Sequence, residues 1–209
     1  MQTWQDSISS TLLAMSGWEL IAVVLAIAYL LLAVKENILC WYAALISTAI
    51  YLFLFWDVSL LMESALQVYY LVMAVYGWYQ WKFVNSTSPE NNQSTIKTWS
   101  PTQHTLCITV ILLLSVLSGL LLQKNTDAAW PFLDSFTTWG AVVTTYMVTK
   151  KVLENWIYWL VIDGLSIYLY MDRGLYLTSI LFMAYLVICI FGFNTWLKQY
   201  RDCSKTQYA

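Results

Sequence analysis

The sequence predicts an all-α membrane protein with seven transmembrane helices, and three observations support this. Hydrophobic residues make up 60% of the 209 residues and charged residues only 11%, whereas a soluble domain of this size carries about a quarter charged residues. The apolar residues form long unbroken runs rather than the alternating pattern of a membrane β-barrel. There are seven such runs, and each is close to the roughly 20 residues that a helix needs to cross the hydrocarbon core.

Short polar breaks separate the runs and carry turn-forming residues, for example Lys35-Glu36-Asn37 after the first run. Asp134 and Ser135 stand where a side chain would cap the start of the fifth helix. A longer segment at 84–103, rich in Ser, Thr, Asn and Gln, is expected to be a loop. The predicted spans are Trp18–Val34, Ile38–Trp56, Leu60–Trp81, His104–Gln123, Asp134–Thr149, Asn155–Met171 and Gly174–Leu197.

Two motifs recur along the chain and predict an internal repeat of three helices, at 18–83 and 134–197, with the span 104–123 as connector. Because one helix connects the copies, both point the same way, which gives a 3+1+3 parallel repeat. The first motif is Gly with Trp four residues later, which occurs as Gly77–Trp81 and again, 115 residues on, as Gly192–Trp196. The second is Glu-Asn with Trp four residues after the Asn. It occurs as Glu36-Asn37 with Trp41 and again, 118 residues on, as Glu154-Asn155 with Trp159.

The basic residues predict how the chain crosses the membrane. With seven spans, eight of the ten basic residues fall on one side and two on the other. Lysine and arginine are enriched in cytoplasmic loops. The segment 1–17 is therefore expected outside and the tail 198–209 in the cytoplasm.

Several function classes are excluded by what the sequence lacks. It has no phosphate-binding loop, no Ser/His/Asp set and no cluster with metal-ligand spacing, and it has a single histidine. Its basic residues are scattered, which argues against nucleic-acid binding. We therefore expect neither an enzyme nor a bound cofactor, but a protein whose partners are membrane lipid and a small molecule.

The strongest candidate for a binding residue is Asp163, a carboxylate inside an apolar run. A charge at that depth is costly, so it should face the interior of the bundle and have a partner. Trp156 and Trp159 lie seven and four residues before it and share its helix face. Two indoles beside a carboxylate suit an organic cation. The alternative is a structural aspartate that hydrogen-bonds a neighbouring helix. At the offset of 118, the equivalents in the first copy are Ile38, Trp41 and Leu45.

Other polar residues in the spans complete the predicted site, each with a structural alternative. In the third span, Glu63, Gln67 and Tyr70 share one face, where Gln67 either binds a polar ring edge or bonds across helices. Glu63 either draws cations to the mouth or is a solvated rim residue. Thr138 either lines a cavity or bonds its own backbone. Asn155 adjoins the tryptophan pair.

The motifs resemble those of the PnuC family of bacterial vitamin transporters, over about Trp18 to Trp196. The resemblance implies a full-length SWEET-like fold, a homotrimer in the bacterial inner membrane, and facilitated diffusion in which a cytoplasmic kinase traps the substrate. The motifs that carry it are Tyr76-Gly-Trp-Tyr-Gln-Trp81, Pro131-Phe-Leu-Asp134-Ser135 and Glu154-Asn-Trp156-Ile-Tyr-Trp159.

Two departures from the family's nicotinamide riboside carriers suggest another substrate. Members that resemble those carriers have the pattern WxxWxxxN in the sixth span, and this chain has Asp163 in place of its asparagine. Such carriers can also have an asparagine at the position of Ala74. The aspartate form is similar to the thiamine-transporting branch, which implies a thiamine uniporter. An ionised aspartate only accepts hydrogen bonds, which suits an exocyclic amine. The alternatives are a nicotinamide riboside transporter, a proton-coupled transporter with Asp163 as the proton carrier, and a non-transporting scaffold.

Overall fold

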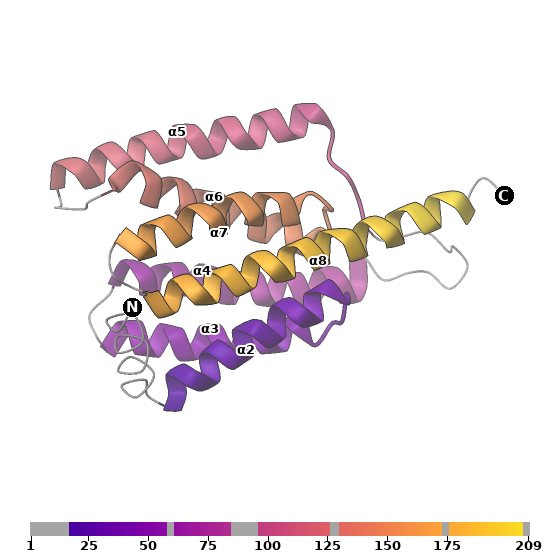
Figure 1. The fold of residues 1–209 in the computed structure, drawn as a ribbon, viewed down its shortest axis with the longest axis horizontal. Coiled ribbons are helices and arrows are strands. Elements are labelled where there is room, and N and C mark those ends of the chain that lie inside the picture. Colours follow the sequence, from indigo (N-terminus) through magenta and orange to yellow (C-terminus); the bar gives the residue numbers. More distant parts are fainter. Residues whose placement is uncertain (1–16, 58–60, 85–95, 126–129, 173–175, 207–209) are drawn as a thin grey trace, which may run out of the picture.

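The computed structural model describes residues 17–57, 61–84, 96–125, 130–172 and 176–206, and within them the chain is built from helices (Figure 1). Each α-helix begins within three residues of a predicted span, so the all-helical class is confirmed. The helices are α2 (Gly17–Val34), α3 (Cys40–Asp57), α4 (Leu61–Tyr79), a π-helical turn η1 (Gln80–Val84), α5 (Pro101–Asn125), α6 (Pro131–Thr149), α7 (Asn155–Asp172) and α8 (Tyr176–Thr206).

Three of these helices are long and apolar enough to cross a membrane by themselves: α2, α5 and the part of α8 at Thr178–Cys203. Helix α5 exposes a row of leucines and valines, among them Leu113 and Leu117, each 60% exposed. Such a surface is unfavourable in water and suits hydrocarbon. Helix α8 continues past the predicted end at Leu197, and Figure 1 shows it extending beyond the other helices.

The helices pack as two units of three, α2–α4 and α6–α8, in which each helix contacts the next. The units meet through two contacts, α2 with α8 and α4 with α6. Helix α5 packs on α6 at the edge of the bundle (Figure 1). The first helix of each unit therefore touches the third helix of the other unit, as expected if a twofold rotation relates the units.

The two units correspond at one offset, 115, along their whole length. Adding 115 to the bounds of α3 gives Asn155–Asp172, the bounds of α7, and adding it to the start of α4 gives Tyr176, the start of α8. The predicted offset of 118 for the sixth span is therefore wrong. Trp156 corresponds to Trp41, Trp159 to Ala44 and Asp163 to Thr48.

The turns after α2 and α6 share this correspondence in detail. Glu36 and Lys151 have φ of 50° and 54°, which is the left-handed conformation common just after a helix. In both turns the next residue donates its N–H five residues back, from Asn37 to Leu32 and from Val152 to Met147. The Glu-Asn pairs at 36–37 and 154–155 therefore do not occupy equivalent positions. The residues that make the same turn are Glu36 and Lys151, which carry opposite charges.

Helix α6 begins earlier than predicted. Trp130 occupies the cap position without a side-chain hydrogen bond to the helix, and Pro131 is the first helical residue. Proline is favoured there because it has no N–H to leave unsatisfied. The prediction that Asp134 caps the helix is therefore wrong, since Asp134 lies in its first turn.

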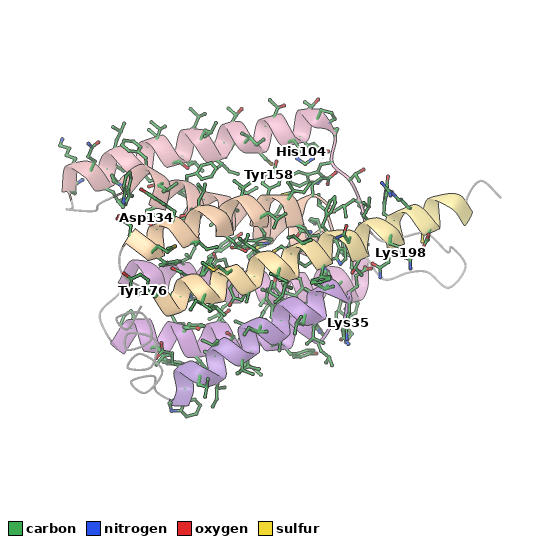
Figure 2. The ribbon with its side chains drawn as sticks, in the orientation of Figure 1. Lys35, His104, Asp134, Tyr158, Tyr176 and Lys198 are labelled. Carbon is green, nitrogen blue, oxygen red and sulfur yellow. The ribbon has the colours of Figure 1, made fainter. Side chains whose placement is uncertain are left out.

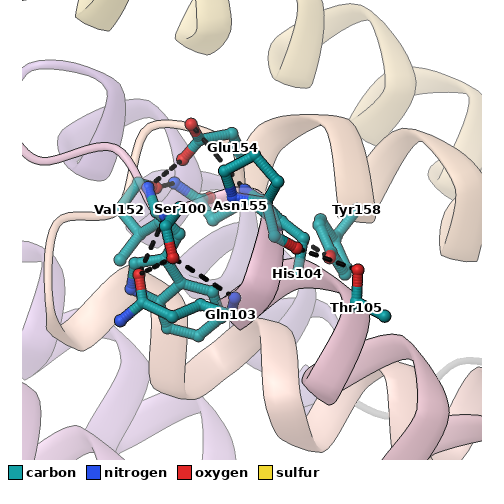
Figure 3. A network of polar contacts seen from close by, with 10 residues as sticks. Ser100, Gln103, His104, Thr105, Val152, Glu154, Asn155 and Tyr158 are labelled. Atoms are coloured by element: carbon teal, nitrogen blue, oxygen red, sulfur yellow. Dashed lines mark hydrogen bonds and ion pairs between the residues drawn. The ribbon is translucent and has the colours of Figure 1, made fainter.

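A segment before α5 attaches this helix to the second unit. Lys97 exchanges backbone hydrogen bonds with Lys151 and Leu153, at 2.9 and 2.8 Å. Figure 3 shows the polar network beside it, in which His104 Nδ1 lies 2.9 Å from the Tyr158 hydroxyl and the backbone N–H of Trp99 donates to Glu154. These contacts fix the start of α5 against the start of α7.

Candidate functional site

Asp163 lies inside the bundle on α7, and its side chain is nearly inaccessible, with 4% of the residue exposed. The thiol of Cys189 on α8 lies 3.9 Å from its carboxylate. Within the described part of the chain, the ion pairs join His104 to Glu154 and Lys151 to Glu36, so neither involves Asp163. A buried ionised carboxylate without a cationic partner is unfavourable, which makes Asp163 a candidate for binding a cation.

Two tyrosines lie near the carboxylate, one from each unit. Tyr70 on α4 and Tyr185 on α8 both lie within electrostatic range of Asp163. They are equivalent at the offset of 115. A phenolic hydroxyl both donates and accepts hydrogen bonds. Two equivalent hydroxyl groups, one from each unit, are therefore available near the aspartate.

Tyr29 extends this group of side chains towards the turns. It lies within electrostatic range of Tyr70 and Cys189, and also of Cys40 at the start of α3. Its ring packs on Trp41 with the centroids 6.0 Å apart. Tyr29 therefore connects the aromatic core at Trp41 with the neighbourhood of Cys189.

The tryptophans of the predicted site differ in their surroundings. Trp156 is 1% exposed, and its ring lies on Gly192 and at the edge of Trp196, with the centroids 5.4 Å apart and the planes at 88°. Its equivalent Trp41 has the same arrangement with Gly77 and Trp81. Trp159 is half-buried, one turn closer to Asp163. Trp156 therefore fills the core, while Trp159 keeps accessible surface.

The buried indole of Trp156 carries an unusual feature. Its Nε1 has no hydrogen-bond partner among the described residues, and the same is true of Trp41 Nε1 and of Asn155 Oδ1. Asn155 is fully buried, and its amide donates to Val152 at 2.6 Å. Buried donors and acceptors of this kind are rare in folded proteins.

The remaining predicted residues are Gln67, Thr138 and Glu63. Gln67 is half-buried on α4. Thr138 donates its hydroxyl to Asp134 of its own helix, at 2.9 Å. Glu63 lies on α4, but its side chain is outside the described residues.

The charge in the bundle is of one sign. Helices α2, α3, α4, α6 and α7 contain no lysine or arginine, and those of α8 come after Leu197. A carboxylate in such surroundings attracts cations and repels anions. The chemistry of this position therefore favours a cation over an anion.

Two residues beside Asp163 were missed from the sequence, Tyr185 and Cys189. Tyr185 follows from Tyr70 once the offset of 115 is applied to the whole repeat. Cys189 carries no comparable signal, because a cysteine in an apolar run is most simply a small buried hydrophobe.

Comparison with known proteins gives one consistent result. Residues 16–198 match the family described as nicotinamide mononucleotide transporter. The nicotinamide riboside transporter PnuC of Escherichia coli is 24% identical over 197 residues, which cover 82% of this chain and 81% of that protein. The riboflavin/roseoflavin transporter RibM of Streptomyces davaonensis is 24% identical over 139 residues, 65% of this chain and 64% of that one.

A solved structure shares the fold. The crystal structure of the vitamin B3 transporter PnuC superposes with a TM-score of 0.70, at 20% identity, over 95% of this chain and 88% of that one. The family match covers most of the chain and its relatives are transporters rather than enzymes. The chain is thus a multi-pass membrane protein that belongs to the PnuC family of vitamin transporters.

Proposed function

We propose that this chain is a uniporter for thiamine, which binds between the two three-helix units with its positive charge at Asp163. The observation that carries the proposal is the buried carboxylate of Asp163, which lies outside both ion pairs of the described residues. Thiamine is a monocation with two flat rings. It can neutralise the aspartate, donate its exocyclic amine to it and stack on Trp159.

The main alternative is nicotinamide riboside, which the names of several relatives favour. Nicotinamide riboside is also a monocation, so charge alone does not separate the two. Hydrogen-bond polarity does, because a carboxamide is best matched by a group that both donates and accepts, such as asparagine. Asp163 only accepts when ionised, and Ala74 offers no polar group.

Either vitamin should be carried without its phosphate. A phosphorylated form brings about two negative charges near neutral pH. The helices that surround Asp163 offer no lysine or arginine to compensate them. The proposed substrate is therefore the free vitamin, and a cytoplasmic kinase that adds the phosphate would trap it inside the cell.

The proposal includes the arrangement in the membrane. The seven helices cross it as a 3+1+3 parallel repeat of the SWEET-like type, with the N-terminus outside and the C-terminus in the cytoplasm of a bacterial cell, and three chains form a homotrimer. The offset of 115 supports the repeat. Figure 2 places Lys35 and Lys198 at one end of the bundle and Asp134 and Tyr176 at the other, and the positive-inside rule favours the lysine end as the cytoplasmic one.

The test is flux in lipid vesicles that contain only this protein. Labelled thiamine should equilibrate across the membrane and be competed by unlabelled thiamine, while labelled nicotinamide riboside moves more slowly and protein-free vesicles show neither flux. Faster flux of nicotinamide riboside would favour the alternative substrate. Accumulation of thiamine above equilibrium under an imposed proton gradient would favour a proton-coupled transporter with Asp163 as carrier, and binding without flux would favour a scaffold.

A further inference from the structure

Two tryptophans mark where the rotation axis between the units passes. Trp81 and Trp196 are equivalent at the offset of 115, and their ring centroids are 6.3 Å apart. Residues related by a twofold axis can contact each other only where they lie on either side of that axis. Each indole also crosses to the other unit, Trp81 to the carbonyl of Val148 and Trp196 to that of Ala33. The two rings therefore fill the boundary between the units at this level.

A second equivalent pair lies next to the tryptophans. Glu36 and Lys151 also correspond at the offset of 115, and Lys151 Nζ lies 2.7 Å from a carboxylate oxygen of Glu36. The same ammonium group lies 4.8 Å from the centre of the Trp81 ring. The side chains are 8% and 18% exposed, so the ion pair is largely shielded from solvent. The tryptophan pair and the ion pair therefore lie next to each other where the two units meet.

The two turns do not themselves require a charged residue at Glu36 or Lys151. Both residues have positive φ in the turn that ends a helix, a position at which glycine is usual because other residues are strained there. Neither copy has glycine. A glutamate in one unit and a lysine in the other gain their interaction only when the two units approach at the axis.

The side chains behind the pair lead towards Asp163. One buried cluster contains Trp81, Trp196, Cys40 and Cys189, and Tyr29 packs against it. The thiol of Cys189 lies 3.9 Å from the carboxylate of Asp163. Cys40 and Cys189 are 0% and 1% exposed. Asp163 is itself 4% exposed, so the proposed binding residue is closed off from the end that carries Lys35 and Lys198.

We infer that Glu36, Lys151, Trp81 and Trp196 form a lock that closes the substrate pathway at the lysine end of the bundle, and that its opening limits substrate release there. This inference rests on the proposed transport function. The Glu36–Lys151 ion pair stabilises the closed state of this lock. When the two units separate at the axis, Cys40 becomes exposed first and Cys189 next.

The experiment measures how fast these two cysteines react. The chain has four cysteines, and replacing Cys107 and Cys203 by serine leaves Cys40 and Cys189 as the only thiols. A membrane-impermeant maleimide is added to vesicles from the lysine end or from the opposite end. Glu36→Gly removes the charge and gives the turn its preferred residue, so the fold should tolerate it.

The lock predicts labelling of Cys40 from the lysine end that is about tenfold faster or more in Glu36→Gly, because the closed state loses its ion pair. Labelling from the opposite end should stay as in the parent protein. The charge exchange Glu36→Lys with Lys151→Glu should restore protection. Lys82→Met is the matched control, since Lys82 is an exposed lysine outside the ion pair, over the rings of Trp78 and Phe83.

Two results would overturn the lock. One is unchanged labelling in a folded Glu36→Gly protein, and the other is an increase from both ends, which indicates general loosening. If Glu36→Gly does not fold, Lys151→Gly is measured in the same way and judged by the same results. Labelling requires no substrate, so the lock can fail while thiamine flux is observed, and the proposed substrate can fail while the lock is observed.

Discussion

Trp81 donates its indole N–H to the backbone carbonyl of Val148, 3.2 Å away, in the other three-helix unit. The equivalent Trp196 makes the equivalent bond to Ala33 at 3.3 Å. Both carbonyls also accept a backbone N–H from the following turn, that of Lys151 or Glu36. Each indole therefore ties one unit to the turn that ends the first helix of the other.

Replacing either tryptophan by phenylalanine should destabilise the protein by a similar amount. The change removes one hydrogen bond and part of a buried ring, about 1–3 kcal/mol in each case. Thermal unfolding in detergent measures the effect. Trp56→Phe is the control, because Trp56 is 66% exposed. A large loss in one variant with none in the other would show that the two bonds are not equivalent in energy.

Trp156 and Trp159 should separate stability from binding. Trp156→Ala empties a core position that is 1% exposed, and should cost roughly 3–5 kcal/mol of unfolding free energy. Trp159→Ala removes a half-buried ring and should mainly weaken thiamine binding, by about 1–3 kcal/mol. Titration of each purified variant with thiamine, alongside its unfolding temperature, measures both effects. Normal stability in Trp156→Ala would contradict its role in the core.

The helices were predictable from the sequence, but the register of the repeat was predicted only in part: the Gly-Trp motif gave the offset of 115, whereas the Glu-Asn motif gave 118 for the sixth span. Long apolar runs are visible in any window of the chain, and each α-helix starts within three residues of its prediction. The register depends on Glu36 and Lys151, which make the same turn with opposite charges and so share no sequence similarity. Glu154 and Asn155 repeat the letters of Glu36 and Asn37 by chance, which shifted the predicted match by three residues.

The surroundings of the predicted site residues could be foreseen only in part, for a similar reason. Asp163 was predictable because a lone charge in an apolar run is costly wherever it packs. The nearby Tyr185 required the correct register, since no local feature distinguishes it from the other tyrosines. The sequence left open where the Thr138 hydroxyl bonds, because a threonine in a helix can donate to its own preceding turn or to another helix.

Asp163→Asn tests the substrate assignment directly. The change keeps the shape of the side chain and removes its charge, so thiamine should bind more weakly by about 1.5–3 kcal/mol. Preference should shift towards nicotinamide riboside, in part only, because Ala74 is unchanged. Competition between the two vitamins for uptake measures the shift. Asp172→Asn is the control, since it lies on the same helix, is exposed, and keeps an oxygen for Trp130. Unchanged affinity and preference in folded Asp163→Asn would make the aspartate structural.

The two tyrosines beside Asp163 should contribute alike to binding. Tyr70→Phe and Tyr185→Phe each remove a hydroxyl and little volume, so each should weaken substrate binding by roughly 0.5–1.5 kcal/mol. Tyr69→Phe is the matched control, because the hydroxyl of Tyr69 donates to Val142 at 2.7 Å. It should lower the unfolding temperature and leave affinity unchanged. Equal affinity in all three variants would remove the tyrosines from the site.

Gly192 and Gly164 should respond to alanine in opposite ways. A Cβ at Gly192 would lie 2.8 Å from the ring atoms of Trp156, which is itself held by Trp196. Gly192→Ala should therefore destabilise the protein by about 1–3 kcal/mol through overpacking. A Cβ at Gly164 meets nothing within 4 Å. Because alanine favours a helix more than glycine does, Gly164→Ala should stabilise the protein by roughly 0.4–1 kcal/mol. The two unfolding temperatures should lie on either side of the parent value, and a stable Gly192→Ala protein would mean that Trp156 can move away from α8.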